Sequence, residues 1–191
     1  MEHVTDLREK WDRVYQRGGS AQALPVLTSH DYLLPESGEA LDLACGLGGN
    51  AEYLARRGLC VLAWDISSVA MSALARRTAD LPLVPQQRDV VEAPPPAGFF
   101  DVVCVGHFLD RDLCPSIAAA LKPGGLLFYQ TFIRDKVDDI GPGTDRFRLE
   151  RNELLTLFPD LTVRFYREEG SVGDIRRGVR NVAQLVAQRC D

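Results

Sequence analysis

Glycines and acidic residues follow one apolar segment at a spacing that suits the binding of a nucleotide. The stretch ALDLACGLGGNAEYLARRG (residues 40–58) runs from a strand-like segment, through a glycine-rich bend, into a helical segment. Gly46, Gly48 and Gly49 allow the backbone to turn tightly and to approach a ligand closely. The bend reads G-x-G-x-x-A, which a dinucleotide loop also does, so the glycines alone do not identify the nucleotide.

Two acidic residues narrow the choice of nucleotide. Asp65 ends the next strand-like segment, where an acidic side chain can accept hydrogen bonds from two ribose hydroxyls. Asp42 precedes Gly46 near the end of an apolar strand, and its charge would repel the pyrophosphate of a dinucleotide. The ammonium group of S-adenosylmethionine would instead be favoured beside Asp42. The alternative is that Asp42 only caps the loop by accepting from its amides.

Two other functions stay open beside methyl transfer from S-adenosylmethionine. An NAD(P)-dependent oxidoreductase has a similar loop, but the Tyr-x-x-x-Lys pair of short-chain dehydrogenases does not occur in the sequence. A non-catalytic protein that binds the cofactor with the same fold is the second alternative, because a fold does not fix a function.

His107 and Asp89 are further candidates, because His107 follows a predicted strand and Asp89 ends one. The reference pKa of histidine is about 6.5, so His107 can serve as a general base. Its ring can equally form the wall of the pocket or make a structural hydrogen bond. Asp89 is either a cofactor ligand or a simple turn residue, since turns favour aspartate.

Aromatic and basic residues are the candidates for binding the second substrate. Trp11 and Tyr15 lie at helical spacing near the start, where they either close the site or only pack. Arg111 either binds an anionic acceptor or pairs with the neighbouring Asp110. The segment 133–149 is long for a connection, and long loops often bind ligands. Arg146 and Arg148 within it are candidates to meet an oxyanion, the alternative being a solvated loop.

The elements that must position these residues alternate along the chain. The apolar spacing predicts a helix near the start that Gly18 and Gly19 end, followed by a short helix around 24–33. The predicted strands are 40–44, 60–65, 83–89, 100–106, 125–132, 161–169 and 180–189, and the later helices 48–57, 67–79, 110–122 and 150–158.

This order predicts an α/β fold with three layers, a doubly wound and mostly parallel sheet of seven strands. Ten residues join the last two strands, which is too short for a helical crossover, so they should form a C-terminal antiparallel hairpin. The length of 191 residues suits a single domain over 1–191, with an N-terminal helical cap at about 1–35.

Composition limits the partners. The net charge of −5 argues against binding to nucleic acid or to an anionic membrane. Five cysteines without a C-x-x-C pair argue against a metal site or a disulfide framework. The charged start MEHVTDLREK is unlike a signal peptide, so we expect a cytoplasmic protein, either a monomer or a homodimer.

The chain resembles the S-adenosylmethionine-dependent methyltransferases with the Rossmann-like seven-stranded fold, over residues 10 to 189. LDLACGLGG is similar to the first motif of that family, AWDIS to its acidic second-strand motif, and QRDV to its adenine loop. FDVVCVGHFLDR and LKPGGLLFYQTF are similar to the fourth and fifth strands. WDRVY and RNELLTLF look most like the small bacterial branch with the tellurite-resistance and thiopurine-type enzymes.

The resemblance implies S-adenosylmethionine as cofactor, S-adenosylhomocysteine as product, and a small acceptor with a thiol, a chalcogen oxyanion or a hydroxyl as nucleophile. Gly46 and Gly48 would pack against the methionine part, with Asp42 facing its ammonium group. Asp65 would bind the ribose and Asp89 the adenine amino group. The full set of cofactor residues implied is Asp42, Ala44, Gly46, Gly48, Asn50, Asp65, Ile66, Ser67, Asp89, Val90 and His107.

Overall fold

A computed structural model describes residues 4–19 and 21–191, and the parts of the predicted N-terminal cap at 1–3 and 20 lie outside the described residues. The strands are β1 (Glu39–Leu43), β2 (Cys60–Asp65), β3 (Leu83–Gln87), β4 (Phe100–Gly106), β5 (Leu121–Phe132), β6 (Thr162–Glu168) and β7 (Val182–Gln188). The helices are α1 (Val4–Gln16), α2 (Pro25–Thr28), α3 (Gly49–Arg56), α4 (Ser68–Arg77), α5 (Cys114–Ala120) and α6 (Glu153–Leu157), with 3₁₀ turns at Asp31–Leu33 and Asp145–Phe147.

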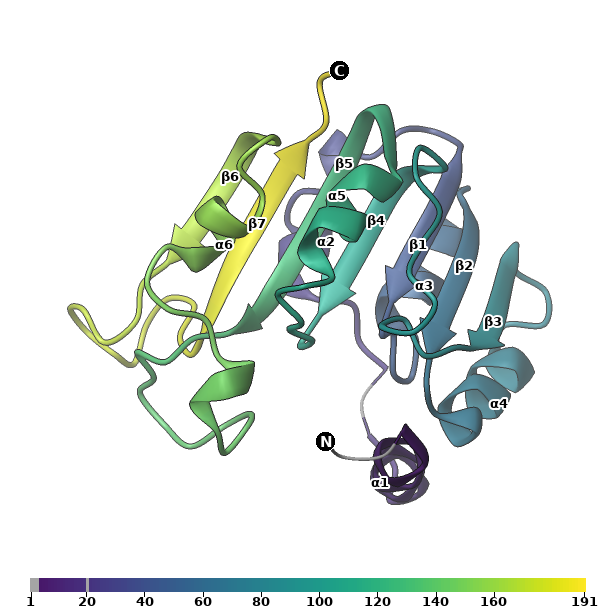
Figure 1. The fold of residues 1–191 in the computed structure, drawn as a ribbon, viewed down its shortest axis with the longest axis horizontal. Helices are drawn as coiled ribbons and strands as arrows, with labels where there is room; N and C mark the ends of the chain where they lie inside the picture. Colours follow the sequence, from purple (N-terminus) through teal and green to yellow (C-terminus); the bar gives the residue numbers. More distant parts are fainter. Residues whose placement is uncertain (1–3, 20) are drawn as a thin grey trace.

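The strands form one sheet of seven in the order β3-β2-β1-β4-β5-β7-β6 (Figure 1). β1 to β5 pair in parallel, whereas β7 pairs antiparallel with both β5 and β6. The predicted mostly parallel sheet and its antiparallel hairpin are therefore confirmed. The second strand of the hairpin, β7, lies between β5 and β6, so β6 forms the edge of the sheet.

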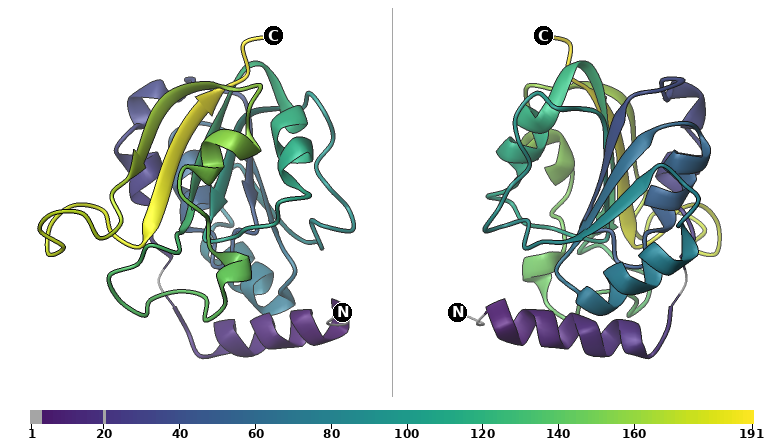
Figure 2. Two further views of the ribbon diagram at one scale, coloured as in Figure 1. Left: turned by 60° about the vertical axis from the view of Figure 1, so that its left-hand side comes forward. Right: turned by 90° about the vertical axis from the view of Figure 1, so that its right-hand side faces the viewer.

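Helices cover both faces of the sheet (Figure 2). One apolar cluster packs around α5 and α6 and contains the buried side chains of Val103, Tyr129 and Leu154. The other packs around α2, α3 and α4 and contains Val61, Leu54 and Leu74. This three-layer arrangement confirms the predicted fold class. The central strands are covered on both faces, which explains why their sequences are mostly apolar.

Three predicted helices have different limits in the structure. The segment 24–33 forms only one turn of α-helix, and the 3₁₀ turn at Asp31–Leu33 follows it. The predicted helix 110–122 begins at Cys114, with a proline in its first turn, and the chain turns into β5 at Leu121. The helix predicted over 150–158 is limited to Glu153–Leu157, and its N-cap Asn152 has a left-handed backbone.

Helix α1 lies apart from the two covering layers. It crosses below the carboxyl ends of β1 and β4, beside α4 (Figures 1 and 2). Asp12 attaches α1 to the first turn of α4, since its Oδ1 accepts from Ser67 Oγ at 2.5 Å and from the Val69 amide at 3.2 Å. Helix α1 therefore covers the carboxyl edge of the sheet.

Candidate cofactor and substrate site

A cavity of about 400 Å³ opens between α1 and the carboxyl ends of the parallel strands. In open α/β sheets this edge is where ligands bind. The residues that line the cavity come from α1, the glycine loop, the ends of β2 and β4, and the segment after β3. Most of the residues predicted from the sequence therefore meet in one place.

The glycine loop and Asp65 are joined directly. The Gly46 amide donates a hydrogen bond to Asp65 Oδ2 at 2.8 Å, and the Ser67 amide donates to Oδ1 at 2.9 Å. Burial raises the pKa of Asp65, while these two backbone hydrogen bonds act to lower it. Each carboxylate oxygen has a second lone pair, so Asp65 can still accept from a ligand in the cavity.

Backbone geometry requires the glycines of the loop. Gly46 and Gly48 have φ angles of 54° and 74°, in the left-handed region that other residues rarely adopt. At Gly49 a Cβ atom would lie 2.5 Å from the Gln22 carbonyl oxygen, so only a glycine fits there. The loop can thus bring its backbone close to a ligand, which is what the sequence motif predicted.

Asp42 is buried behind the loop and does not line the cavity. Its Oδ2 accepts from the Ala51 amide in the first turn of α3 at 2.9 Å, and Asn50 Nδ2 lies 3.5 Å from Oδ1. Burial raises the pKa of Asp42 to about 7. The predicted direct contact with an ammonium group is therefore replaced by the alternative, a cap for backbone amides, because the start of α3 supplies unpaired N–H donors.

Asn50 links Asp42 to the cavity. Its Oδ1 accepts from the Leu24 amide at 2.8 Å, and its side chain lies on the cavity wall. Ala44 also lines the cavity and has a φ of 53°. Ser67, by contrast, is the N-cap of α4 and accepts from the Ala70 amide, outside the cavity lining. Ser67 thus supports the position of Asp65 and does not face a ligand itself.

The segment after β3 forms the other end of the cavity, with Asp89 and Val90 in its wall. Asp89 Oδ1 accepts from the Val91 amide at 2.9 Å, as a turn residue does, while Oδ2 has no partner among the described residues. Arg88, which the sequence analysis missed, holds this turn: its guanidinium lies 3.9 Å from the centre of the Trp64 ring and donates to the carbonyls of Ala93 and Pro94.

His107 directly follows β4 and lines the cavity. It has a φ of 53°, and its ring stacks on Phe132 with the centres 4.8 Å apart. Desolvation by its surroundings lowers the pKa of His107 below the usual value, so the imidazole is neutral at pH 7. A neutral imidazole at this position can accept a proton.

Of the residues predicted to bind the second substrate, only the two aromatic ones line the cavity. Trp11 and Tyr15 stack with their ring centres 5.8 Å apart, and the Tyr15 hydroxyl lies over Gly46. Arg111 instead pairs with Glu153, and its Nη atoms donate to the carbonyls of Arg146 and Arg148.

The two arginines of the loop 133–149 are also outside the cavity lining. Arg148 is only 2% exposed and donates to the carbonyls of Ile133, Ile140 and Pro142. Arg146 is exposed, with its guanidinium over the Phe147 ring. Backbone carbonyls and Glu153 occupy the donors of Arg111 and Arg148, so these two side chains have structural partners in place of an oxyanion. Binding of an oxyanion by Arg146 stays a prediction.

The sheet order, the glycine loop and the acidic strand end together are the arrangement of the Rossmann-like methyltransferase fold. Residues 40–125, which include the loop, Asp65 and His107, match the family model of a methyltransferase domain. In the described residues no helix is long and apolar enough to cross a membrane, and no group of side chains has the composition of a metal site.

YqeM of Bacillus subtilis (strain 168), which is named as a methyltransferase, is 31% identical over 119 residues, 57% of this chain and 48% of YqeM. The matched region is thus about half the length of that relative. TehB of Haemophilus influenzae has a TM-score of 0.71 at 18% identity, covering 94% of this chain and 67% of TehB. An S-adenosylmethionine-dependent methyltransferase of Mesorhizobium loti has a TM-score of 0.68 at 18% identity, covering 90% and 99%.

A third structure shows the product of the cofactor in this fold. The geranyl diphosphate C-methyltransferase of Streptomyces coelicolor A3(2), solved with S-adenosyl-L-homocysteine, has a TM-score of 0.69 at 16% identity, covering 99% and 98%. S-adenosylmethionine is accordingly the cofactor of the class. The cavity of this protein fits S-adenosylmethionine. Its wall contains Asp89, whose Oδ2 has no partner among the described residues, and the loop glycines Gly46 and Gly48, which let the backbone approach a ligand closely.

Proposed function

We propose that the protein is a methyltransferase that transfers the methyl group of S-adenosylmethionine to a small-molecule acceptor. The observation that carries the proposal is the hydrogen bond from the Gly46 amide to Asp65, inside one cavity at the carboxyl edge of the sheet. The match of residues 40–125 to the methyltransferase domain supports it. The free thiols of Cys45, Cys60, Cys104, Cys114 and Cys190 are consistent with a reducing, cytoplasmic compartment.

The residues of the cavity have distinct roles in this proposal. Asp65 accepts from the ribose hydroxyls, and Gly46 and Gly48 pack against the methionine part. Asp89 accepts from the adenine amino group through its open oxygen, with Val90 beside the ring. Asp42 and Ser67 act one step away, by fixing the start of α3 and of α4.

The chemistry needs little from the protein beyond alignment. The bound cofactor supplies an electrophilic methyl group on a positively charged sulfur. The chain then has to hold an acceptor in line with that methyl group and to exclude water, and good alignment alone can contribute about 7–11 kcal/mol. α1 covers the site from below, and His107 is the neutral group placed to take the acceptor's proton.

Calorimetric titration of the purified protein with S-adenosylmethionine tests the proposal. We expect micromolar binding that the Asp65→Ala variant loses by at least about a hundredfold, since a pair of charge-assisted hydrogen bonds contributes about 3 kcal/mol or more. The matched control is Asp80→Ala, which removes an exposed carboxylate from the turn after α4.

NAD, titrated in parallel, is expected to give no heat of binding. Binding of NAD in place of S-adenosylmethionine would overturn the proposal in favour of an oxidoreductase. Normal cofactor binding without methyl transfer to any acceptor of a broad panel would instead identify a non-catalytic cofactor-binding protein.

A further inference from the structure

The chain adopts a strained backbone conformation directly after β4. His107 has a φ of 53°, in the left-handed region that residues with a Cβ atom rarely adopt. Ala44, directly after β1, has the same φ, and both residues line the cavity. The other non-glycine residues with this backbone in the described parts of the chain are Asn152 and Asn181, and asparagine tolerates it. Such strain persists only where neighbouring contacts hold it, and it is concentrated at functional sites.

Three contacts from β5 hold the turn formed by His107 and Phe108. The His107 amide donates to the Gln130 carbonyl at 2.8 Å, which continues the pairing of β4 with β5. The His107 ring stacks on that of Phe132, with the ring centres 4.8 Å apart and the planes at 23°. The Tyr129 hydroxyl donates to the Phe108 carbonyl at 2.9 Å. The turn is therefore fixed at both of its ends.

Tyr129 holds this turn from outside the cavity. It pairs with Val105 of β4 in the sheet, and its side chain is completely buried and is not part of the cavity lining. Its ring packs beside that of Phe158, with the ring centres 5.6 Å apart. A buried hydroxyl needs a hydrogen-bond partner, and in the described part of the chain the Phe108 carbonyl is the acceptor that Tyr129 contacts.

The hydroxyl of Tyr129 stays protonated near neutral pH. Burial raises the pKa of Tyr129 well above its ordinary value, and the nearby Cys114 and Asp110 act in the same direction, whereas the cation of Arg111 acts against them. The hydroxyl is therefore a donor, and its hydrogen bond to the backbone does not depend on pH in this range.

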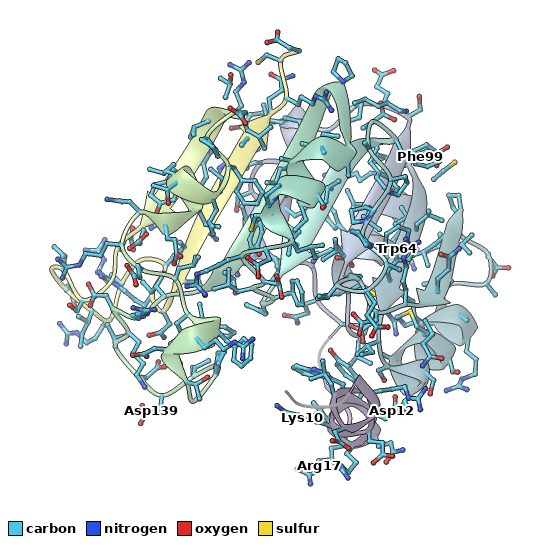
Figure 3. The ribbon with its side chains drawn as sticks, viewed as in Figure 1. Lys10, Asp12, Arg17, Trp64, Phe99 and Asp139 are labelled. Atoms are coloured by element: carbon cyan, nitrogen blue, oxygen red, sulfur yellow. The ribbon has the colours of Figure 1, made fainter. Side chains whose placement is uncertain are left out.

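The restraint on His107 comes from β5 and not from α1 across the cavity. Asp12 points from α1 toward α4, where it contacts Ser67, while Lys10 projects from the other side of the helix (Figure 3). Among the described residues, the hydrogen bonds made by His107 and Phe108 go to β5. The position of the histidine thus depends on the sheet itself.

We propose that Tyr129 is a positioning residue that fixes His107 at the cavity by holding the Phe108 carbonyl. The proposal rests on the proposed function, in which His107 takes the proton of the acceptor. A general base must lie within hydrogen-bond reach of the proton that it abstracts, so its position has to be restrained. Without the restraint, the backbone at His107 would relax toward the common region of φ and ψ, and the ring would move with it.

A tyrosine with only a structural role predicts a different result from a positioning residue. Removing a buried hydrogen bond lowers stability wherever the bond lies. A positioning role predicts in addition that the change is concentrated at His107, while the affinity for the cofactor stays the same.

Nuclear magnetic resonance of the full chain tests the proposal with Tyr129→Phe, which keeps the ring and removes only the hydroxyl. The chain has three histidines, so the ring signals of His107 are assigned by their loss in His107→Asn. In the parent the Phe132 ring should shift these signals upfield, because the two rings stack. We expect Tyr129→Phe to lose most of this upfield shift, and the His107 amide to exchange at least about fivefold faster.

The matched control is Tyr166→Phe on β6, which removes a hydrogen bond to Glu168 from another tyrosine. It should leave the ring signals and the amide exchange of His107 unchanged. The same changes in Tyr166→Phe would overturn the inference, and so would unchanged signals and exchange in Tyr129→Phe. A Tyr129→Phe chain that does not fold would overturn it as well, because the hydroxyl would then serve the fold and not the position of His107.

Titration of the parent and of Tyr129→Phe with S-adenosylhomocysteine tests the proposed function separately. Both should bind it equally, because Tyr129 does not line the cavity. A parent that binds no S-adenosylhomocysteine would lose the proposed function, whereas a parent that binds it with a His107 unaffected by Tyr129→Phe would lose only this inference. Weaker binding by Tyr129→Phe would show that Tyr129 shapes the cofactor site as a whole, against a role limited to His107.

Discussion

Asp42 was expected to face the cofactor because of its charge, but it lies buried behind the glycine loop. It is completely buried, and its carboxylate accepts from the Ala51 amide at the start of α3. The match of residues 40–125 to a methyltransferase domain, and not this carboxylate, is therefore the finding that argues against a dinucleotide enzyme. A buried carboxylate with few partners costs stability when it is ionised.

The pH dependence of stability follows from Asp42. Its pKa is raised by burial from 3.8 to about 7, so the folded state binds the proton more tightly than the unfolded state does. The Asp42 contribution is fully present below about pH 4 and is lost as the pH rises to about 7. We expect Asp42→Asn to melt a few degrees higher than the parent at pH 8, since about 1 kcal/mol corresponds to about 2–4 °C at this size.

Thermal denaturation at pH 5 and pH 8 checks this prediction. The advantage of Asp42→Asn should shrink at pH 5, where more of the parent carboxyl is protonated. Asp80→Asn is the control, because that side chain is exposed. An advantage that is equal at both pH values would contradict the assignment to Asp42.

Contacts between residues of known motifs could be predicted from the sequence. Contacts with residues outside any motif could not. The pairing of Gly46 with Asp65 follows from two adjacent strands in a known order, so spacing was sufficient. Arg111 pairs with Glu153, which lies 42 residues further along the chain, and no local pattern indicates that contact. Arg88 was missed for the same reason, since its stacking on Trp64 depends on the pairing of β2 with β3.

At the scale of elements, Arg148 organises the loop between β5 and α6. Its guanidinium donates to carbonyls at the start of the segment, at Ile133, and in its middle, at Pro142, and it lies 5.6 Å from the centre of the Phe132 ring. The loop 133–149 has little apolar burial of its own, because most of its residues are exposed. One buried side chain therefore holds most of the loop together.

We expect Arg148→Met to destabilise the protein by about 2–4 kcal/mol, because three buried or half-buried carbonyls lose their donor. Hydrogen exchange should rise first in residues 134–147, which urea denaturation and exchange mass spectrometry can measure together. The exposed Arg146→Met is the matched control and should change neither quantity. Loss of cofactor affinity in Arg148→Met without faster exchange would show that Arg148 acts at the site instead.

Element limits were less predictable than element types. All seven strands were predicted with the right type. Apolar runs mark the buried strands β1, β4 and β5, whereas the edge strands β3 and β6 are largely exposed and carry a weaker pattern. The helix expected at 110–122 was too long, since Asp110 caps the turn at Leu113 and α5 begins only at Cys114. Local turn hydrogen bonds of this kind depend on side-chain geometry that periodicity does not contain.

For the molecule as a whole, the cofactor cavity joins parts that are separate in the chain. Its walls come from α1, the loop after β1, the end of β2 and the turn after β3. A ligand that contacts all of them should stabilise the entire fold, because it binds only when they are assembled.

We expect S-adenosylhomocysteine at a hundred times its dissociation constant to add about 2.7 kcal/mol to the free energy of unfolding. That corresponds to a rise of about 5–11 °C in the melting temperature at this size. Differential scanning fluorimetry with and without the ligand measures the rise. Asp65→Ala should rise by no more than about 1–2 °C at the same ligand concentration, because a hundredfold weaker affinity leaves only about 0.4 kcal/mol. A shift as large as that of the parent would mean that the ligand binds elsewhere.

The sheet order was only partly predictable from the sequence. The short link between β6 and β7 predicted their antiparallel pairing, but either strand of the hairpin could have paired with β5. β7 takes the inner position and is buried nearly throughout, whereas β6 has exposed residues such as Val163. β7 contains more apolar residues than β6, which explains why β7 and not β6 pairs with β5.

The inner position of β7 has a consequence for the order in which the chain can fold. β6 precedes β7 in the sequence, yet its only partner in the sheet is β7, so β6 has no strand to join until β7 has formed. The free edge of β5 meanwhile lacks the partner that will cover it. β6 can therefore join the sheet only with β7 or after it, and a chain emerging from the ribosome carries an open edge on β5 until β7, near its C-terminal end, has been made.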